Sequence, residues 1–165
     1  MKAKSNLINQ ICNQTRQALC LEVLNSNPHS ARADLKGLGR ISIYTVQKHA
    51  KQTSVLIASL LKGAKNSKLK QQYNRCAKAY GGAIGDLNGA KKILKKKVLS
   101  PSDISAFRSR ASAAFKGLVT CVDAFDYEIG PGEPSNQPPK LKQANDKFVE
   151  LYGIVSDIGV NLKSG

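Results

Sequence analysis

Tryptophan is absent from this sequence, and its other aromatic residues, four Phe and five Tyr, make up only 5% of 165 residues. Most of them fall at positions that an amphipathic helix would bury, which leaves no platform on which nucleic-acid bases could stack. Acidic residues are also few, because 11 Asp and Glu accompany 26 Lys and Arg and give a formal charge of +15. The sequence therefore predicts a basic protein that attracts a polyanion other than nucleic acid.

Long apolar runs are missing as well. No stretch approaches the roughly 20 residues that cross a membrane, and no apolar segment follows the lysines of MKAKSNLINQ, the first ten residues. We therefore expect no membrane partner and no secretory signal in the sequence as given, although a signal removed earlier would leave no trace. The apolar fraction of 41% argues against disorder and predicts one globular domain.

The usual signs of catalysis are also lacking. His29 and His49 read as solvated histidines without a partner, and Asp123 and Asp126 read as solvated charges on a helix surface. The glycines of YGGAIGDLNGA, residues 80–90, follow no strand, so close helix packing explains them better than a phosphate-binding loop. We expect neither an enzyme nor a bound metal or cofactor.

Helical periodicity is what the sequence does have. Apolar residues recur at alternating steps of four and three, the pattern of helices packed in a bundle, over residues 43–60, 69–94, 104–125 and 141–162. Ser100 and Pro101 have the features of a helix N-cap and first turn. Residues 66–68 and the Pro/Gly-rich residues 130–140 read as connections. We predict an all-α, up-and-down four-helix bundle over residues 30–163.

Four cysteines suggest two cross-links. Cys76 and Cys121 fall on the apolar seams of two predicted helices, so both point into the same core. Cys12 and Cys20 would stand ~12 Å apart on a straight helix, beyond disulfide reach, so their pairing requires a bend in the chain. We favour 12–20 and 76–121 over the two other connectivities, with free thiols as the alternative; structural zinc suits these spacings less well.

We therefore interpret residues 5–27 as a short helical appendage ahead of the bundle, stapled by the Cys12–Cys20 pair. Paired cysteines are typical of secreted proteins. The tripeptide NQT at 13–15 agrees with secretion, since it supplies a sequon for N-glycosylation at Asn13.

Five segments spread over nearly the whole chain carry a family pattern: ICNQTRQALCLEVLNSNP, DLKGLG, KQTSVLIASLL, YNRCAKAYGGAIGDLNGAKKIL and ASAAFKGLVTCVDAF. In these segments the chain resembles the plant invertase and pectin methylesterase inhibitors. The most specific elements of the resemblance are the two cysteines eight apart, the pair Cys76 and Tyr80, and Thr120 before Cys121. The resemblance implies a single inhibitor domain with an N-terminal helical hairpin, a four-helix bundle, the same two disulfides and secretion to the plant cell wall.

The two branches of this family inhibit different enzymes. Invertase inhibitors carry a Pro-Lys-Phe motif between the second and third bundle helices, where this chain has KKKVLSPSDISAF. DLKGLG, AKQTS and ASAAF resemble the methylesterase inhibitors. The resemblance therefore implies a pectin methylesterase inhibitor, with an invertase inhibitor and a basic polyanion-binding protein as the alternatives.

The resemblance also implies a mechanism, a one-to-one non-covalent complex in which a bundle face covers the pectin-binding cleft of the enzyme. The face expected from the second and third bundle helices comprises Gln71, Asn74, Lys78, Ser109, Ser112, Lys116 and Thr120. Thr120 is carried over most directly, and ordinary helix surface is the alternative for each residue.

A cluster of positive charge is expected at the end of the second bundle helix. It consists of Lys91, Lys92, Lys95, Lys96 and Lys97. Cations suit the C-terminal end of a helix, so a solvated helix end is one interpretation. The other is binding to demethylesterified pectin, or attraction to an acidic enzyme cleft.

Overall fold

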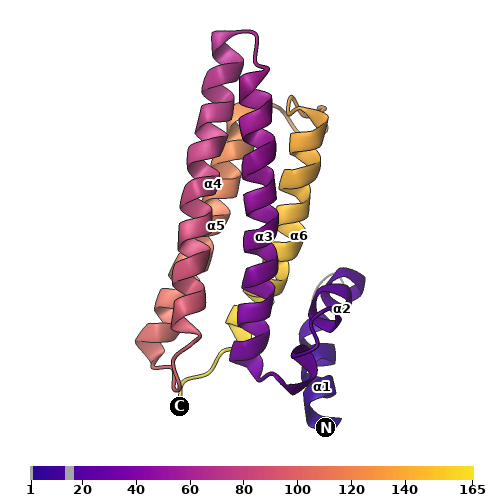
Figure 1. Ribbon diagram of the computed structural model, residues 1–165, viewed down its shortest axis with the longest axis vertical. Coiled ribbons are helices and arrows are strands. Elements are labelled where there is room, and N and C mark those ends of the chain that lie inside the picture. Colours follow the sequence, from indigo (N-terminus) through magenta and orange to yellow (C-terminus); the bar gives the residue numbers. More distant parts are fainter. Residues whose placement is uncertain (1, 14–16) are drawn as a thin grey trace.

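The chain folds as four long antiparallel helices preceded by two short ones (Figure 1). The computed structural model describes residues 2–13 and 17–165. All regular elements within these residues are helical: α1 (Lys2–Cys12), α2 (Gln17–Asn25), the 3-10 helix η1 (Ser30–Arg32), α3 (Leu35–Lys62), α4 (Ser67–Ile93), α5 (Pro101–Asp126) and α6 (Pro139–Asn161). The predicted all-α bundle is confirmed.

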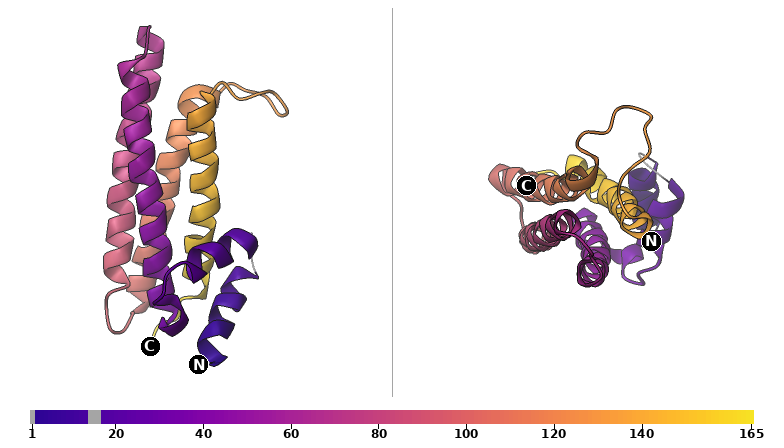
Figure 2. Two further views of the ribbon diagram at one scale, coloured as in Figure 1. Left: turned by 45° about the vertical axis from the view of Figure 1, so that its right-hand side comes forward. Right: turned by 90° about the horizontal axis from the view of Figure 1, so that it is seen from above.

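The long helices form a square in cross-section. Helix α3 packs against α4 and α6, and α5 packs against the same two, so α3 and α5 lie at opposite corners. The view from above shows this arrangement, and the side view shows α3 and α4 running past the adjacent ends of α5 and α6 (Figure 2). The α3–α4 turn therefore projects beyond the rest of the bundle.

Side-chain caps set where the helices begin. Ser100 accepts a hydrogen bond from the Asp103 backbone N–H, and the Asp103 carboxylate accepts one from the Ser100 N–H, which is a complete capping box before α5. Asn66 caps α4 by accepting a hydrogen bond from the Leu69 N–H at 2.9 Å, and α4 begins at Ser67, so residues 67 and 68 of the predicted connection are helical. Asp34 caps α3, accepting from the Gly37 N–H at 2.8 Å.

Helix α3 begins two turns before the periodic apolar pattern. Its first turns pack closely against the end of α4 because glycine there has no side chain. A Cβ on Gly39 would lie 2.6 Å from Leu94 Cδ1, so the lack of a side chain lets α3 meet the end of α4. Lys36 and Arg40 strengthen this contact. The Lys36 ammonium donates to the carbonyl oxygens of residues 96 and 97, and the Arg40 guanidinium donates to the Leu94 carbonyl oxygen.

The apolar seams of all four helices meet in one core. Its largest fully buried side chains include Tyr80, Phe107, Phe148, Leu38, Ile57 and Leu118. Tyr80 packs edge-on against Phe148, with ring centroids 5.8 Å apart. Periodicity therefore identified the buried faces because burial follows the helical repeat.

The N-terminal pair α1 and α2 lies beside the lower ends of α3 and α6 (Figure 2). The Cys12–Cys20 disulfide joins the pair, with Cα atoms 5.3 Å apart. Ile11 and Leu24 are buried there. Asn13 of the predicted sequon is exposed, but residues 14 and 15 of that tripeptide lie outside the described residues.

Candidate functional site

Helices α4 and α5 make the most extensive contact in the bundle. Gly117 of α5 lies directly against α4, since a Cβ at this position would stand 2.9 Å from the Ala79 carbonyl oxygen and 3.3 Å from the Ala83 Cβ. Any side chain at residue 117 would push the helices apart. The Cys76–Cys121 disulfide links the same two helices, with Cα atoms 4.3 Å apart. This is the cross-link favoured from the sequence.

An open groove of about 650 Å³ lies between the exposed faces of α4 and α5. Its lining residues are Asn74, Arg75, Lys78, Ala79, Gly82, Ala83, Asp86, Ala113, Gly117 and Thr120. The less exposed members are mostly small, which leaves room between the helices, whereas the exposed members are mostly polar or charged. No histidine, serine or free thiol is among them. The groove is open, and its side chains can form hydrogen bonds and ion pairs, so it is suited to contact with another molecular surface.

Three of the seven contact residues expected from the sequence line this groove: Asn74, Lys78 and Thr120. The other four are exposed on the same two helices but outside the groove lining: Gln71, Ser109, Ser112 and Lys116. Gln71 continues the row of Asn74 and Lys78 by one helical turn, and Lys116 precedes Thr120 by one turn. The structure thus brings three of the seven expected residues together in the groove and leaves the other four exposed on the same two helices.

Thr120 stands at the edge of the groove beside the buried Cys121. Its hydroxyl donates to the Lys116 backbone carbonyl oxygen at 3.0 Å. The proton of this hydroxyl is therefore engaged within α5, and the oxygen remains available to accept a hydrogen bond from a partner.

One end of the groove carries an ion pair that the sequence did not indicate. Arg110 Nη1 lies 3.3 Å from Asp86 Oδ1, and the Arg110 side chain covers Gly89. Asp86 lies on the same face of α4 as the expected contacts Asn74 and Lys78, because residues 74, 78, 82 and 86 are spaced four apart. Extending this spacing along the helix would have identified Asp86 as a groove residue.

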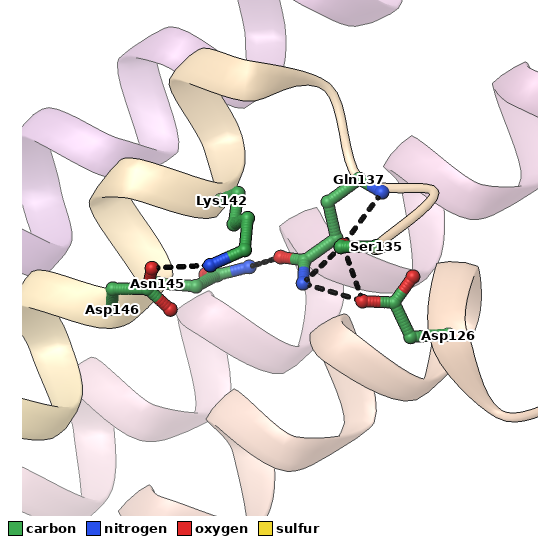
Figure 3. Close-up of polar contacts among 6 residues, drawn as sticks. All are labelled: Asp126, Ser135, Gln137, Lys142, Asn145 and Asp146. Carbon is green, nitrogen blue, oxygen red and sulfur yellow. Dashed lines mark hydrogen bonds and ion pairs between the residues drawn. The ribbon is translucent and has the colours of Figure 1, made fainter. Parts of the chain in front are cut away.

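Polar contacts hold the loop between α5 and α6 against the end of the bundle (Figure 3). Asp126 accepts hydrogen bonds from Ser135 Oγ at 2.6 Å, from Gln137 Nε2 at 2.7 Å and from the Asn136 N–H at 2.7 Å. Burial acts to raise the pKa of Asp126, but these hydrogen bonds outweigh it, and its pKa lies below the ordinary value. The expectation that Asp126 is a merely solvated charge is wrong, because its partners come from the loop.

The same contacts continue into the core through Asn145. Its Nδ2 donates to Gln137 Oε1 at 2.7 Å, and its Oδ1 accepts from the Tyr80 hydroxyl at 2.6 Å. Burial raises the pKa of Tyr80 well above its ordinary value, so the phenol remains a neutral donor. A continuous chain of hydrogen bonds therefore connects the loop, α6 and α4.

His49 is not the exposed residue that the sequence suggested. It is half-buried, and its Nε2 lies 2.8 Å from the Ala144 carbonyl oxygen, where it can only donate. His29 is exposed, as expected. Among the residues that the structure describes, no cluster of His, Cys, Asp or Glu could hold a metal ion, and no helix is long and apolar enough to span a membrane.

Comparison with known proteins identifies the family. The family model described as plant invertase/pectin methylesterase inhibitor matches residues 6–158. The chain belongs to this family. A pectinesterase inhibitor of Actinidia deliciosa is 44% identical over 94% of this chain and 78% of its own length, and a putative invertase inhibitor of Platanus acerifolia is 30% identical over 82% and 69%. A crystal structure of a mutant Arabidopsis pectin methylesterase inhibitor superimposes with a TM-score of 0.75 and 25% identity, covering 96% of this chain and 98% of that one.

In this member of the invertase/pectin methylesterase inhibitor family, the five lysines expected at the end of the second bundle helix do not form one free cluster, and three of them, Lys95, Lys96 and Lys97, lie beyond the last residue of α4, Ile93. Lys96 pairs with Asp103 at 2.5 Å, and Lys91 donates to Gln47 Oε1 at 3.1 Å. Lys92, Lys95 and Lys97 are exposed. The group is thus partly engaged in holding the end of α4 to its neighbours.

The glycines of α4 are not packing residues in this inhibitor fold, which corrects the interpretation made from the sequence. A Cβ added to Gly81, Gly82 or Gly85 would meet nothing within 4 Å, and only at Gly89 does a neighbour, Arg110, approach closely. The first three glycines face away from the buried seam. They leave these exposed positions of α4 without side chains, and Gly82 lines the groove.

Proposed function

We propose that this protein inhibits a plant pectin methylesterase by forming a one-to-one, non-covalent complex in which the groove between α4 and α5 lies across the enzyme's pectin-binding cleft. The observation that carries the proposal is the groove, because it is open and its residues offer shape, hydrogen-bonding groups and charge to a protein partner. The relative named as a pectinesterase inhibitor, at 44% identity, supports this choice of enzyme.

Invertase is the second candidate, because a relative at 30% identity is named as a putative invertase inhibitor. The sequence of the connection between α4 and α5 argues against invertase as the target. Its proline, Pro101, occupies the first turn of α5 behind the Ser100 cap and is followed by Ser102, so the Pro-Lys-Phe motif expected for invertase inhibitors is missing.

The proposed place of action is the plant cell wall. Two disulfides, Cys12–Cys20 and Cys76–Cys121, persist in oxidising compartments and are rare in the cytosol. Glycosylation at Asn13 would agree with secretion. In that setting, the exposed lysines Lys92, Lys95 and Lys97 are proposed to add attraction to acidic pectin or to an acidic enzyme surface.

Replacement of Thr120 by Arg tests the groove. The Arg side chain would bring an unpaired charge and extra volume into the interface, and we expect inhibition to weaken by roughly 30-fold or more, about 2 kcal/mol. Thr120→Ala should weaken it by at most about fivefold, since only one neutral hydrogen bond is lost. Titration of plant pectin methylesterase with each variant measures both effects.

Gln143→Arg is the matched control, because it adds the same charge to the exposed face of α6 and should leave inhibition unchanged. Circular dichroism and disulfide mapping verify that each variant is folded. Full inhibition by Thr120→Arg would show that the groove is not part of the interface with the enzyme. If wild-type protein blocked invertase stoichiometrically and left several methylesterases active, the choice of enzyme would be wrong.

A further inference from the structure

The net positive charge is concentrated in one half of the bundle. Residues 35–100, which form α3, α4 and their connections, carry fifteen Lys and Arg and one acidic residue, Asp86, for a formal charge of +14. Residues 101–165, with α5 and α6, carry seven Lys and Arg against eight Asp and Glu. The net charge of +15 is therefore almost entirely a property of the α3–α4 half.

Helix α3 presents part of this charge as a single row, which we call the α3 stripe. The stripe consists of residues at steps of three and four, which share one helix face: Arg40, Tyr44, Lys48, Lys51, Val55, Ala58 and Lys62. All but the half-buried Arg40 are exposed. At 1.5 Å per residue the stripe is about 33 Å long. Four cations and no acid lie along it.

A pocket of about 620 Å³ marks the lower end of the stripe. Arg32, Arg40 and the ring of Tyr44, which is 58% exposed, are among its lining residues. Acidic groups near the stripe are Asp34, which lines this pocket and is engaged by the Gly37 N–H, and Glu22 of α2, which lines a second cavity with Lys48. The upper end of the stripe reaches the projecting α3–α4 turn (Figure 2).

The stripe faces away from the proposed enzyme-binding groove. Because α3 and α5 lie at opposite corners of the bundle, the outer face of α3 remains accessible when a protein covers the groove between α4 and α5. A partner on the stripe and a partner in the groove would therefore not compete for the same residues.

We propose that the α3 stripe binds de-esterified pectin, a linear polymer with one carboxylate on each unesterified sugar. The choice of this polyanion rests on the proposed function, since a methylesterase hydrolyses the methyl esters of pectin, releasing methanol and leaving carboxylates along the polymer. An extended row of cations with one exposed aromatic ring at its end suits a linear acidic polysaccharide. Nucleic acid fits less well, because Tyr44 is the one exposed aromatic residue of α3 and α4, and Tyr73 and Tyr80 are buried.

Binding to immobilised polygalacturonate at increasing salt, with no enzyme present, tests the proposal. Lys51→Gln/Lys62→Gln removes two stripe charges that have no part in the groove or the N-terminal hairpin. If a loss of roughly 0.7 counterion per contact applies, as for single-stranded polyanions, the slope of log K against log salt should fall by about 1.4. Fully methyl-esterified pectin should not compete.

Lys140→Gln/Lys142→Gln is the matched control, since it removes the same charge from exposed positions of α6. It should leave the slope nearly unchanged. Equal effects of the two double variants would show that net charge alone attracts the polymer and would overturn the proposal. Tighter binding of single-stranded DNA than of polygalacturonate with equal charge would overturn the assignment to pectin. If wild-type protein bound the polymer but did not inhibit methylesterase, this result would instead contradict the proposed function.

Discussion

Glycine-to-alanine exchanges on α4 and α5 distinguish two effects: the cost of disturbing the contact between the two helices, and the effect of adding a methyl group in the groove between them. At Gly82 a Cβ meets nothing within 4 Å, so Gly82→Ala should stabilise the fold by about 1 kcal/mol through helix propensity. At Gly117 the same methyl group would stand 2.9 Å from the Ala79 carbonyl oxygen, closer than such atoms approach in proteins. Overpacking of this kind costs about 1–3 kcal/mol.

The comparison of the two variants isolates the packing cost, because the gain in helix propensity is common to both and cancels. Gly117→Ala should unfold at a temperature roughly 2–12 °C below that of Gly82→Ala, at about 2–4 °C per kcal/mol for a chain of this size. Thermal unfolding followed by circular dichroism, with the disulfides intact, measures the difference. Equal melting temperatures would refute the close approach of α4 and α5 at residue 117.

The same exchanges report on function. Gly82 lines the groove, whereas Gly85 is equally exposed on α4 but lies outside the lining. Gly82→Ala should therefore weaken methylesterase inhibition even though it stabilises the fold, and Gly85→Ala should stabilise the fold without weakening inhibition. Equal inhibition by both variants would argue that the enzyme does not approach the groove at Gly82.

The hydrogen bonds behind the α5–α6 loop support two further predictions. Tyr80→Phe and Asn145→Leu each leave a buried polar partner unpaired and should destabilise the protein by about 1–3 kcal/mol, whereas the double variant should lose less than the sum, as measured by urea unfolding. Asp126 has a folded pKa below the unfolded value of about 3.9, so its contribution to stability is complete above about pH 4 and is lost as the pH falls through the folded pKa. The stability difference between wild type and Asp126→Asn should shrink across that range, and a constant difference would contradict the role given to this carboxylate.

The sequence predicted the four long helices because each buries a seam that repeats at steps of three and four. It missed the first turns of α3 because small residues such as Gly37 and Gly39 pack there without an apolar side chain. It misjudged Gly81 and Gly85 on α4, although their positions between the seam residues Tyr80, Ala83 and Leu87 already place them off the buried face.

The candidate site was only partly accessible from the sequence. Once a family resemblance indicates which helix takes part in binding, helical periodicity predicts which of its residues share an exposed face, as for Asn74 and Lys78. The hydrogen bonds of Asp126 could not be foreseen, since Ser135 and Gln137 reach it only through the path of an irregular loop. Pairings across helices, such as Arg110 with Asp86, depend on the relative height of α4 and α5, which periodicity leaves undetermined.

The disulfide beneath Thr120 has a consequence for affinity. Cys76 and Cys121 join the two helices that frame the groove, and their cross-link closes a chain segment of 45 residues, which on a chain-entropy model stabilises the fold by about 4 kcal/mol. The spacing of the two groove walls is thus established before any enzyme arrives. Association then requires little ordering of the inhibitor backbone, and such preorganisation leaves more of the contact free energy available as affinity. Reduction of this one cross-link would therefore weaken binding even at temperatures where the helices stay folded.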